Sequence, residues 1–122
     1  MAAPDPKPRV MVDANVLFAG VVWPRWPYEV LQHALRGDFQ LLLSPLVIAQ
    51  ARRALTPRYA GWVPAFDGLL EKLPFELAPD PSRAELHRHA GLVRDDTDIP
   101  VALAAINAGV DYLVSEDKDL TV

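Results

Sequence analysis

The stretch VMVDANVL, residues 10–17, decides the fold, because it passes from an apolar strand through an acid into a helix-forming segment. Its first three residues are apolar and two of them are β-branched, which is typical of a strand buried on both faces of a parallel sheet. A helix is expected over residues 15–22, ahead of Pro24. The proline-rich segment before residue 10 predicts a flexible tail over residues 1–8.

Outward from this stretch, apolar runs alternate with amphipathic segments along the chain. Further strands are predicted at 39–43, 75–77 and 112–114, and further helices at 27–36, 45–55, 62–73, 82–93 and 98–107. Parallel strands joined by helical crossovers form a three-layer α/β/α sandwich with a mainly parallel sheet. At 122 residues the chain is expected to form one domain, residues 9–122.

Composition narrows the classes of protein. Hydrophobic residues make up 51% and charged residues 23%, which predicts a globular core rather than disorder. The absence of cysteine excludes disulfides and thiolate metal sites, and it fits a cytoplasmic protein. Residues 1–94 carry 11 basic and 9 acidic residues (+2), whereas residues 95–122 carry 1 basic and 7 acidic residues (−6). Because the acidic segment contains apolar runs, we expect it to fold and to need a counter-charge such as a metal ion.

Three acids occupy equivalent places in this scheme. Asp13 follows the first strand, Asp98 opens the helix before the last strand, and Asp117 follows the last strand. The carboxyl ends of parallel strands share one edge of the sheet, where ligands bind. Each acid also has a structural explanation, as a helix cap, a first-turn acid or a surface turn. Carboxylates that gather at one edge repel one another unless a hard cation such as Mg²⁺ or Mn²⁺ lies among them.

Several spaced motifs resemble those of the PIN domain family, including its VapC-like toxins. VMVDANVL at 10–17 is similar to the family's first strand and first acidic motif. DDTD at 95–98 and GVDYLVSEDKDL at 109–120 are similar to its C-terminal half, and LLLSP at 41–45 resembles the segment that leads to its second acid. The resemblance covers about residues 9–120.

The resemblance implies a metal-dependent ribonuclease that hydrolyses RNA phosphodiesters with Mg²⁺ or Mn²⁺. It implies that Asp13, Asp98 and Asp117 are the catalytic, metal-binding acids, and that Asn15, Ser115 and Gln50 support them. The metal would activate a water and stabilise the charge on the phosphate. By the same resemblance the chain is the toxin of a toxin–antitoxin pair, with a small antitoxin as its partner.

Two departures from the family pattern weaken the expected site. Gln50 stands where the family has a glutamate, so it offers a carbonyl oxygen without the negative charge. The sequence also ends soon after the strand at 112–114, so the last helix and strand of the fold are expected to be missing. An open strand edge favours pairing with another chain, and we expect a homo-oligomer. Both departures favour the alternative that the chain is a non-catalytic PIN-fold binding module or a degenerate relic.

Two other acid-based folds fit less well. A haloacid-dehalogenase-like phosphatase needs a second aspartate two residues after Asp13, where this chain has Asn15. A receiver-type phosphoacceptor domain needs its acid pair at the first strand, whereas the pair here is Asp95-Asp96.

Basic residues on and after the helix at 45–55 could bind an RNA backbone. Arg52, Arg53 and Arg58 cluster there, and a solvated helix face is the competing interpretation. The three tryptophans are expected to serve in packing rather than in base stacking.

Overall fold

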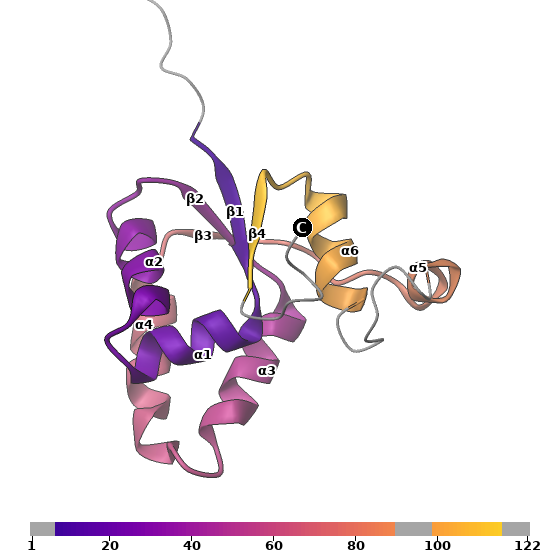
Figure 1. Cartoon of the computed structure of the whole chain (residues 1–122). Helices are drawn as coiled ribbons and strands as arrows, with labels where there is room; N and C mark the ends of the chain where they lie inside the picture. Colours follow the sequence, from indigo (N-terminus) through magenta and orange to yellow (C-terminus); the bar gives the residue numbers. More distant parts are fainter. Residues whose placement is uncertain (1–6, 90–98, 116–122) are drawn as a thin grey trace, which may run out of the picture.

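The computed structural model of the chain describes residues 7–89 and 99–115. Within these residues strands and helices alternate (Figure 1), in the order β1 (Arg9–Val12), α1 (Ala14–Val22), α2 (Trp26–Leu35), β2 (Gln40–Leu43), α3 (Pro45–Leu55), a 3₁₀ turn (Ala60–Trp62), α4 (Val63–Lys72), β3 (Phe75–Leu77), α5 (Arg83–Arg88), α6 (Ile99–Ala108) and β4 (Tyr112–Val114). The predicted order of elements is confirmed. The predicted and observed strand bounds agree within one residue. Trp62, predicted to begin a helix, is instead the last residue of the 3₁₀ turn, and α4 begins at Val63.

The four described strands form one parallel sheet in the order β3-β2-β1-β4. Met11 lies beside Leu42 on one neighbour and beside Leu113 on the other. All three pairings are parallel, which requires a crossover between each pair of paired strands. The predicted α/β class with a parallel sheet is therefore confirmed.

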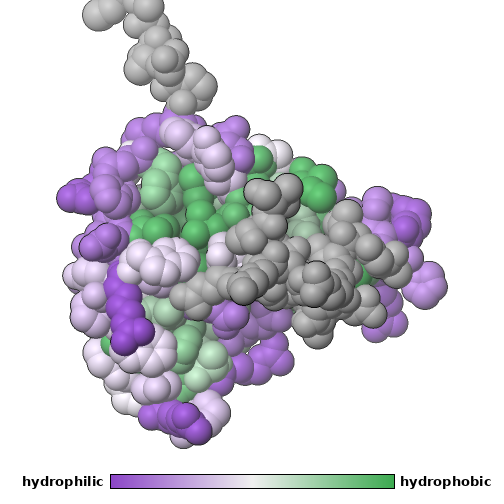
Figure 2. Space-filling model, in the orientation of Figure 1, coloured by the Kyte–Doolittle hydropathy of each residue, from purple (hydrophilic) through white to green (hydrophobic). Residues whose placement is uncertain are grey.

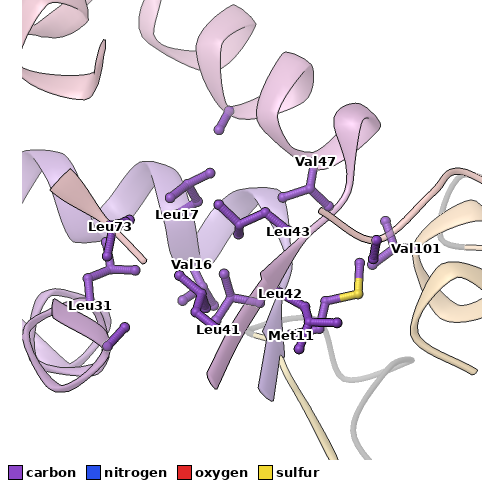
Figure 3. Packing of buried hydrophobic residues seen from close by; sticks show 14 of the residues in the cluster. Met11, Val16, Leu17, Leu31, Leu41, Leu42, Leu43, Val47, Leu73 and Val101 are labelled. Atoms are coloured by element: carbon purple, nitrogen blue, oxygen red, sulfur yellow. The ribbon is translucent and has the colours of Figure 1, made fainter. Parts of the chain in front are cut away.

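Helices cover both faces of the sheet. In Figure 1, α1, α2 and α4 lie on one side of the strands and α6 lies on the other. The close-up in Figure 3 shows Met11 pointing toward Val101 of α6, and Leu41 next to Val16 of α1. Successive residues of a strand point to opposite faces of the sheet. Met11 and its partners on the adjacent strands, Leu42 and Leu113, therefore face α6. Val10 and Val12 face α1 and α2.

Local sequence signals set the ends of the helices. Asp13 and Ser44 cap α1 and α3, because their side chains accept hydrogen bonds from the backbone N–H groups of Val16 and Val47. At α5 the hydroxyl of Ser82 and the carboxylate of Glu85 form a reciprocal capping box. Gly37 and Gly109 have φ angles of 79° and 66°, and this left-handed conformation ends α2 and α6. The helix predicted over 82–93 ends at Arg88, with His89 as its C-cap, and the predicted residues after His89 lie outside the described part of the chain.

A single apolar core lies between the sheet and its helices (Figure 3). Leu41, Leu42 and Leu43 of β2 are fully buried, as are Leu17 of α1 and Phe66 of α4. Complete burial of a leucine-sized side chain contributes about 1.5–3 kcal/mol. The core is what fixes β1 and β2 side by side, and so it also fixes where their carboxyl ends lie.

Strand β4 forms one edge of the described sheet, and Tyr112 on it is 63% exposed. Figure 2 shows apolar surface gathered over the part of this view where β1, β2 and β4 lie. The predicted self-association through this edge stays a prediction. No helix within the described residues is long and apolar enough to cross a membrane.

Candidate functional site

The carboxyl end of β1 carries a buried acid. Asp13 follows Val12 and is 5% exposed. Its carboxylate oxygen Oδ1 accepts a hydrogen bond of 2.9 Å from the backbone N–H of Val16, and its carbonyl oxygen accepts from the backbone N–H of Leu17. Its own N–H donates to the carbonyl of Val114, 3.2 Å away. The carboxylate is therefore fixed at the point where β1, β4 and the start of α1 meet.

Ser115 brings the end of β4 to the same point. Val12 and Val114 are partners in the parallel ladder, so the next residue on each strand is also adjacent. The hydroxyl of Ser115 donates a hydrogen bond to Oδ2 of Asp13, across 102 residues of sequence. This contact holds the second carboxylate oxygen in place, and the supporting role of Ser115 in a metal site stays a prediction.

Buried polar side chains are concentrated at this edge of the sheet. Among residues 7–89 and 99–115, the buried polar or charged residues are Asp13 and Ser44. Each follows a strand directly and caps the next helix. Burying a polar group is unfavourable unless it is hydrogen-bonded, and both side chains accept a backbone N–H.

The other predicted supporting residues lie on the helices that begin at this edge. Asn15 is exposed in the first turn of α1. Gln50 lies in the middle of α3 with intermediate burial, and α3 packs against α1. Because Gln50 precedes the buried Ala51 and Arg52 follows it, the two side chains lie on opposite sides of the buried stripe of α3. The supporting role of Gln50 stays a prediction.

Two of the three predicted acids, Asp98 and Asp117, lie outside the described residues. Their nearest described neighbours in sequence are Ile99, the first residue of α6, and Ser115. Within the described part of the chain, no group of three acidic, histidine or cysteine side chains could hold a metal ion. The predicted convergence of three carboxylates therefore stays a prediction, with Asp13 as its described member.

The predicted RNA-binding arginines differ in their surroundings. Arg52 forms an ion pair of 2.6 Å with Asp67 of α4, and its guanidinium lies 5.2 Å from the ring centre of Phe66. Arg53 and Arg58 are exposed, and neither forms an ion pair with another described residue. Arg52 thus packs α3 against α4, whereas Arg53 and Arg58 leave their charge available to a ligand.

An aromatic cluster lies where packing was expected. The ring centres of Phe18, Trp23 and Tyr59 are 5.4 to 5.7 Å apart. Trp23 is 37% exposed, and Trp26 and Trp62 are more exposed still. Sequence patterns did not predict the cluster, because it joins the end of α1 to the loop after α3.

The donor atoms at the sheet edge fit a hard divalent cation. The Asp13 carboxylate and the Ser115 hydroxyl that contacts it both carry oxygen, the type of donor that Mg²⁺ and Mn²⁺ prefer. The buried position of Asp13 also limits its hydration, which favours a charged partner over solvent. The chemistry of the donor set is therefore compatible with the expected metal.

Comparisons with known proteins agree with this architecture. No curated protein sequence matches the chain significantly. The crystal structure of PAE2754 from Pyrobaculum aerophilum superposes with a TM-score of 0.68 at 22% identity, covering 93% of this chain and 82% of that one. VapBC2 from Rickettsia felis, solved bound to a DNA fragment from their promoter, gives a TM-score of 0.62 at 16% identity and covers 89% of this chain and 99% of that one.

These two structures share the fold, and a family-level match goes further. The family model described as PIN domain matches residues 9–119. The match begins at the first residue of β1 and includes both strand ends that meet at Asp13. The chain therefore belongs to the PIN domain family.

Proposed function

We propose that the chain is a metal-dependent ribonuclease whose site is built around Asp13. The observation that carries the proposal is the buried Asp13 carboxylate, held from both sides by Val16 and Ser115 at the edge where β1 and β4 end. A carboxylate fixed in this way is pre-organised, so a bound cation would not have to wait for the side chain to reorient. Membership in the PIN domain family supports the same assignment.

In this proposal Asp13, Asp98 and Asp117 hold Mg²⁺ or Mn²⁺, and Gln50 adds a neutral oxygen. The bound cation would supply Lewis-acid stabilisation of the charge that develops on the RNA phosphate. Ser115 keeps the Asp13 carboxylate in one orientation through its hydroxyl. Asn15, exposed in the first turn of α1, would support the acid, as the family resemblance implies.

Arginines on the neighbouring helix would hold the RNA backbone. Arg53 and Arg58 are exposed and carry charges that no described acid neutralises. Contacts from arginine to phosphate give affinity without reading the base sequence. Arg52 has a smaller part in the proposal, because Asp67 already neutralises it.

The proposal includes a toxin role in the cytoplasm with a small antitoxin as partner, and self-association through β4. The antitoxin rests on the resemblance to VapC-like toxins and on the fold shared with VapBC2. The self-association rests on the exposed edge at Tyr112.

A second candidate function is favoured by one residue. Gln50 replaces a negative charge with a neutral amide, which weakens the attraction for a cation. The chain would then be a PIN-fold binding module that no longer cleaves RNA. The two candidates differ in one measurable property, the metal-dependent cleavage of RNA.

The test is cleavage of a labelled single-stranded RNA by the whole chain with Mn²⁺ and with excess chelator. Asp13→Asn keeps a side-chain oxygen to cap α1, since asparagine and aspartate cap helices equally well. We expect it to lower the cleavage rate by about a hundredfold or more while the chain stays folded. Asp38→Asn is the matched control, because Asp38 is an exposed acid that pairs with His33. Cleavage that survives both chelator and Asp13→Asn would overturn the proposal.

A further inference from the structure

We infer that a surface at the far end of α1 binds the unpaired bases of single-stranded RNA. The surface consists of Phe18, Trp23 and Tyr59 with the two arginines Arg25 and Arg58, and it is called here the aromatic–arginine surface. The inference rests on the proposed ribonuclease function, to which it adds a binding site for the substrate strand away from Asp13.

Of the three aromatic rings, Trp23 offers the most surface to a ligand. Trp23 meets Phe18 at an interplanar angle of 87° and Tyr59 at 79°, and Phe18 meets Tyr59 at 58°. None of these pairs is parallel, and Phe18 and Tyr59 are also partly buried against the core. Trp23 is more than a third exposed. Each base that stacks on such a ring adds about 1–3 kcal/mol, whatever its identity.

Backbone contacts hold these rings at fixed positions. Trp23 ends α1, because the proline after it forces an extended conformation, and its N–H donates to the carbonyl of Ala19. Tyr59 is fixed by a hydrogen bond of 2.7 Å from its N–H to the carbonyl of Leu55. A Cβ atom at Gly20 would collide with Leu31, so α1 and α2 are packed as closely as glycine allows. The rings therefore need little further ordering to bind a ligand.

Two cations flank the rings in sequence. Arg58 directly precedes Tyr59, and Arg25 follows Trp23 by two residues and donates its N–H to the Trp23 carbonyl at 2.9 Å. Both arginines are exposed, and neither pairs with an acid within residues 7–89 and 99–115. A strand whose bases stack on the rings brings a phosphate for each nucleotide, which matches these positive charges.

The position of the surface suits a strand that also reaches Asp13. At 1.5 Å per residue, α1 spans about 15 Å from Asp13 to Trp23, the length of a few extended nucleotides. Asn15 and Phe18 lie three residues apart and so share one face of α1 between these points. The path along α1 therefore joins the acid to the aromatic–arginine surface.

A second surface of the molecule makes a useful contrast. The open groove beside α3 has a volume of 660 Å³ and is lined by Pro45, Ile48, Ala49, Arg52, Arg53 and Leu77. Its uncharged residues are aliphatic or proline, which suits a protein side chain better than a base. Figure 2 shows hydrophilic, intermediate and hydrophobic colours side by side over the part of the view where α1 and α3 lie. Rings with polar edges beside cations favour nucleic acid over an apolar protein segment.

The test measures binding rather than cleavage, with the whole chain and a fluorescein-labelled oligouridylate in excess chelator. We expect Trp23→Leu to weaken binding about tenfold by fluorescence anisotropy, and Trp23→Phe to retain most of the affinity. Arg25→Gln and Arg58→Gln should each lower the slope of log affinity against log salt by about 0.7. These exposed arginines keep the test usable even if Trp23→Leu does not fold. Arg83→Gln, at an exposed arginine of α5, is the matched control and should leave the affinity unchanged.

Equal affinity of the wild type, Trp23→Leu and the Arg25→Gln/Arg58→Gln double variant would overturn the inference. Competition by duplex RNA as strong as that by single-stranded RNA would also overturn it, because paired bases do not stack on protein rings. The result of this binding test can be distinguished from the result of the cleavage test at Asp13. RNA binding that depends on Trp23 without Mn²⁺-dependent cleavage keeps this inference and removes the ribonuclease, whereas cleavage with Trp23-independent binding does the reverse.

Discussion

At the amino end of the sheet, Arg9 binds Glu76 through two hydrogen bonds of 2.9 Å, and both side chains are partly open to solvent. At the carboxyl end, Asp13 is buried, and its carboxylate accepts from the N–H of Val16 and the hydroxyl of Ser115. An exposed pair keeps most of its hydration and joins two strands at little expense in free energy. A buried carboxylate loses hydration that neutral donors only partly replace.

The two ends of the sheet therefore differ in the burial of their charged side chains and in the groups that these side chains contact. The Arg9 side chain joins β1 to β3 and also donates to the carbonyl of Ala108 at the end of α6. Its backbone N–H donates to the carboxylate of Asp111, just before β4. Every one of these contacts ties elements together. Asp13 also caps α1, but it does so from a buried position at the strand ends, where the proposed cation would bind.

After Asp13→Asn, the largest expected effect comes from adding a negative charge near the carboxyl end of the sheet. Gln50→Glu would place a second carboxylate on α3, and we expect Mn²⁺ to bind about tenfold more tightly, with faster RNA cleavage. Isothermal titration calorimetry of both proteins measures the affinity. Gln40→Glu is the matched control, since Gln40 lies at the amino end, where its side chain donates to the carbonyls of Leu41 and Pro74. Identical Mn²⁺ affinities for the wild type and Gln50→Glu would show that Gln50 does not face the metal.

The elements at both ends were predictable because their signals are local. The apolar run before Asp13 and the Ser44-Pro45 pair predicted β1 and the start of α3 from adjacent residues alone. Ser115 could be named from its motif, but its hydrogen bond to Asp13 depends on the pairing of β1 with β4, 102 residues apart. Local sequence does not specify such a register.

The parts that sequence did not predict all depend on packing between distant helices. Arg52 pairs with Asp67 because α4 folds back beside α3, a contact that the sequence did not predict, and its RNA binding stays a prediction. Trp23 was expected to serve in packing, and it does contact Phe18 and Tyr59, but at the surface rather than in the core. Neither outcome can be read from the spacing of residues within one helix.

A smaller effect is expected at the amino end. Arg9→Met would keep the aliphatic stem but remove both hydrogen bonds to Glu76 and the one to Ala108. We expect the thermal unfolding midpoint to fall by a few degrees, with RNA cleavage unchanged, because Asp13 lies at the opposite end of β1. Differential scanning calorimetry and the cleavage assay test the two parts separately. Arg36→Met is a control at an exposed ion pair outside the sheet. A loss of RNA cleavage in a folded Arg9→Met variant would contradict the prediction that the amino end of the sheet affects stability alone.

The smallest expected effect is the acid dependence of stability at the amino end. The Arg9 hydrogen bonds lower the pKa of Glu76 below its ordinary value of 4.5. Because the folded pKa is the lower one, the pair stabilises the fold fully above about pH 4.5 and loses this contribution as pH falls through the folded pKa. The pKa of Glu85 is lowered in the same direction, first by the backbone N–H of Ser82 and then by Asn107. Protonation of Glu85 at low pH therefore also lowers the stability of the fold, and this loss does not involve Arg9.

Unfolding midpoints in urea, measured from pH 6 to pH 3 for the wild type and Arg9→Met, isolate the share of Glu76. The difference between the two proteins should be constant at the upper end of this range and should shrink as Glu76 takes up a proton. Glu85→Gln is the matched control: it removes a different carboxylate, so the difference between wild type and Arg9→Met should persist in its background. A difference that stays constant down to pH 3 would mean that Arg9 acts through Ala108 and packing rather than through the charge of Glu76. In that case Arg9 would stabilise the sheet through packing and its hydrogen bond to Ala108. The amino end would then differ from Asp13 in burial rather than in charge pairing.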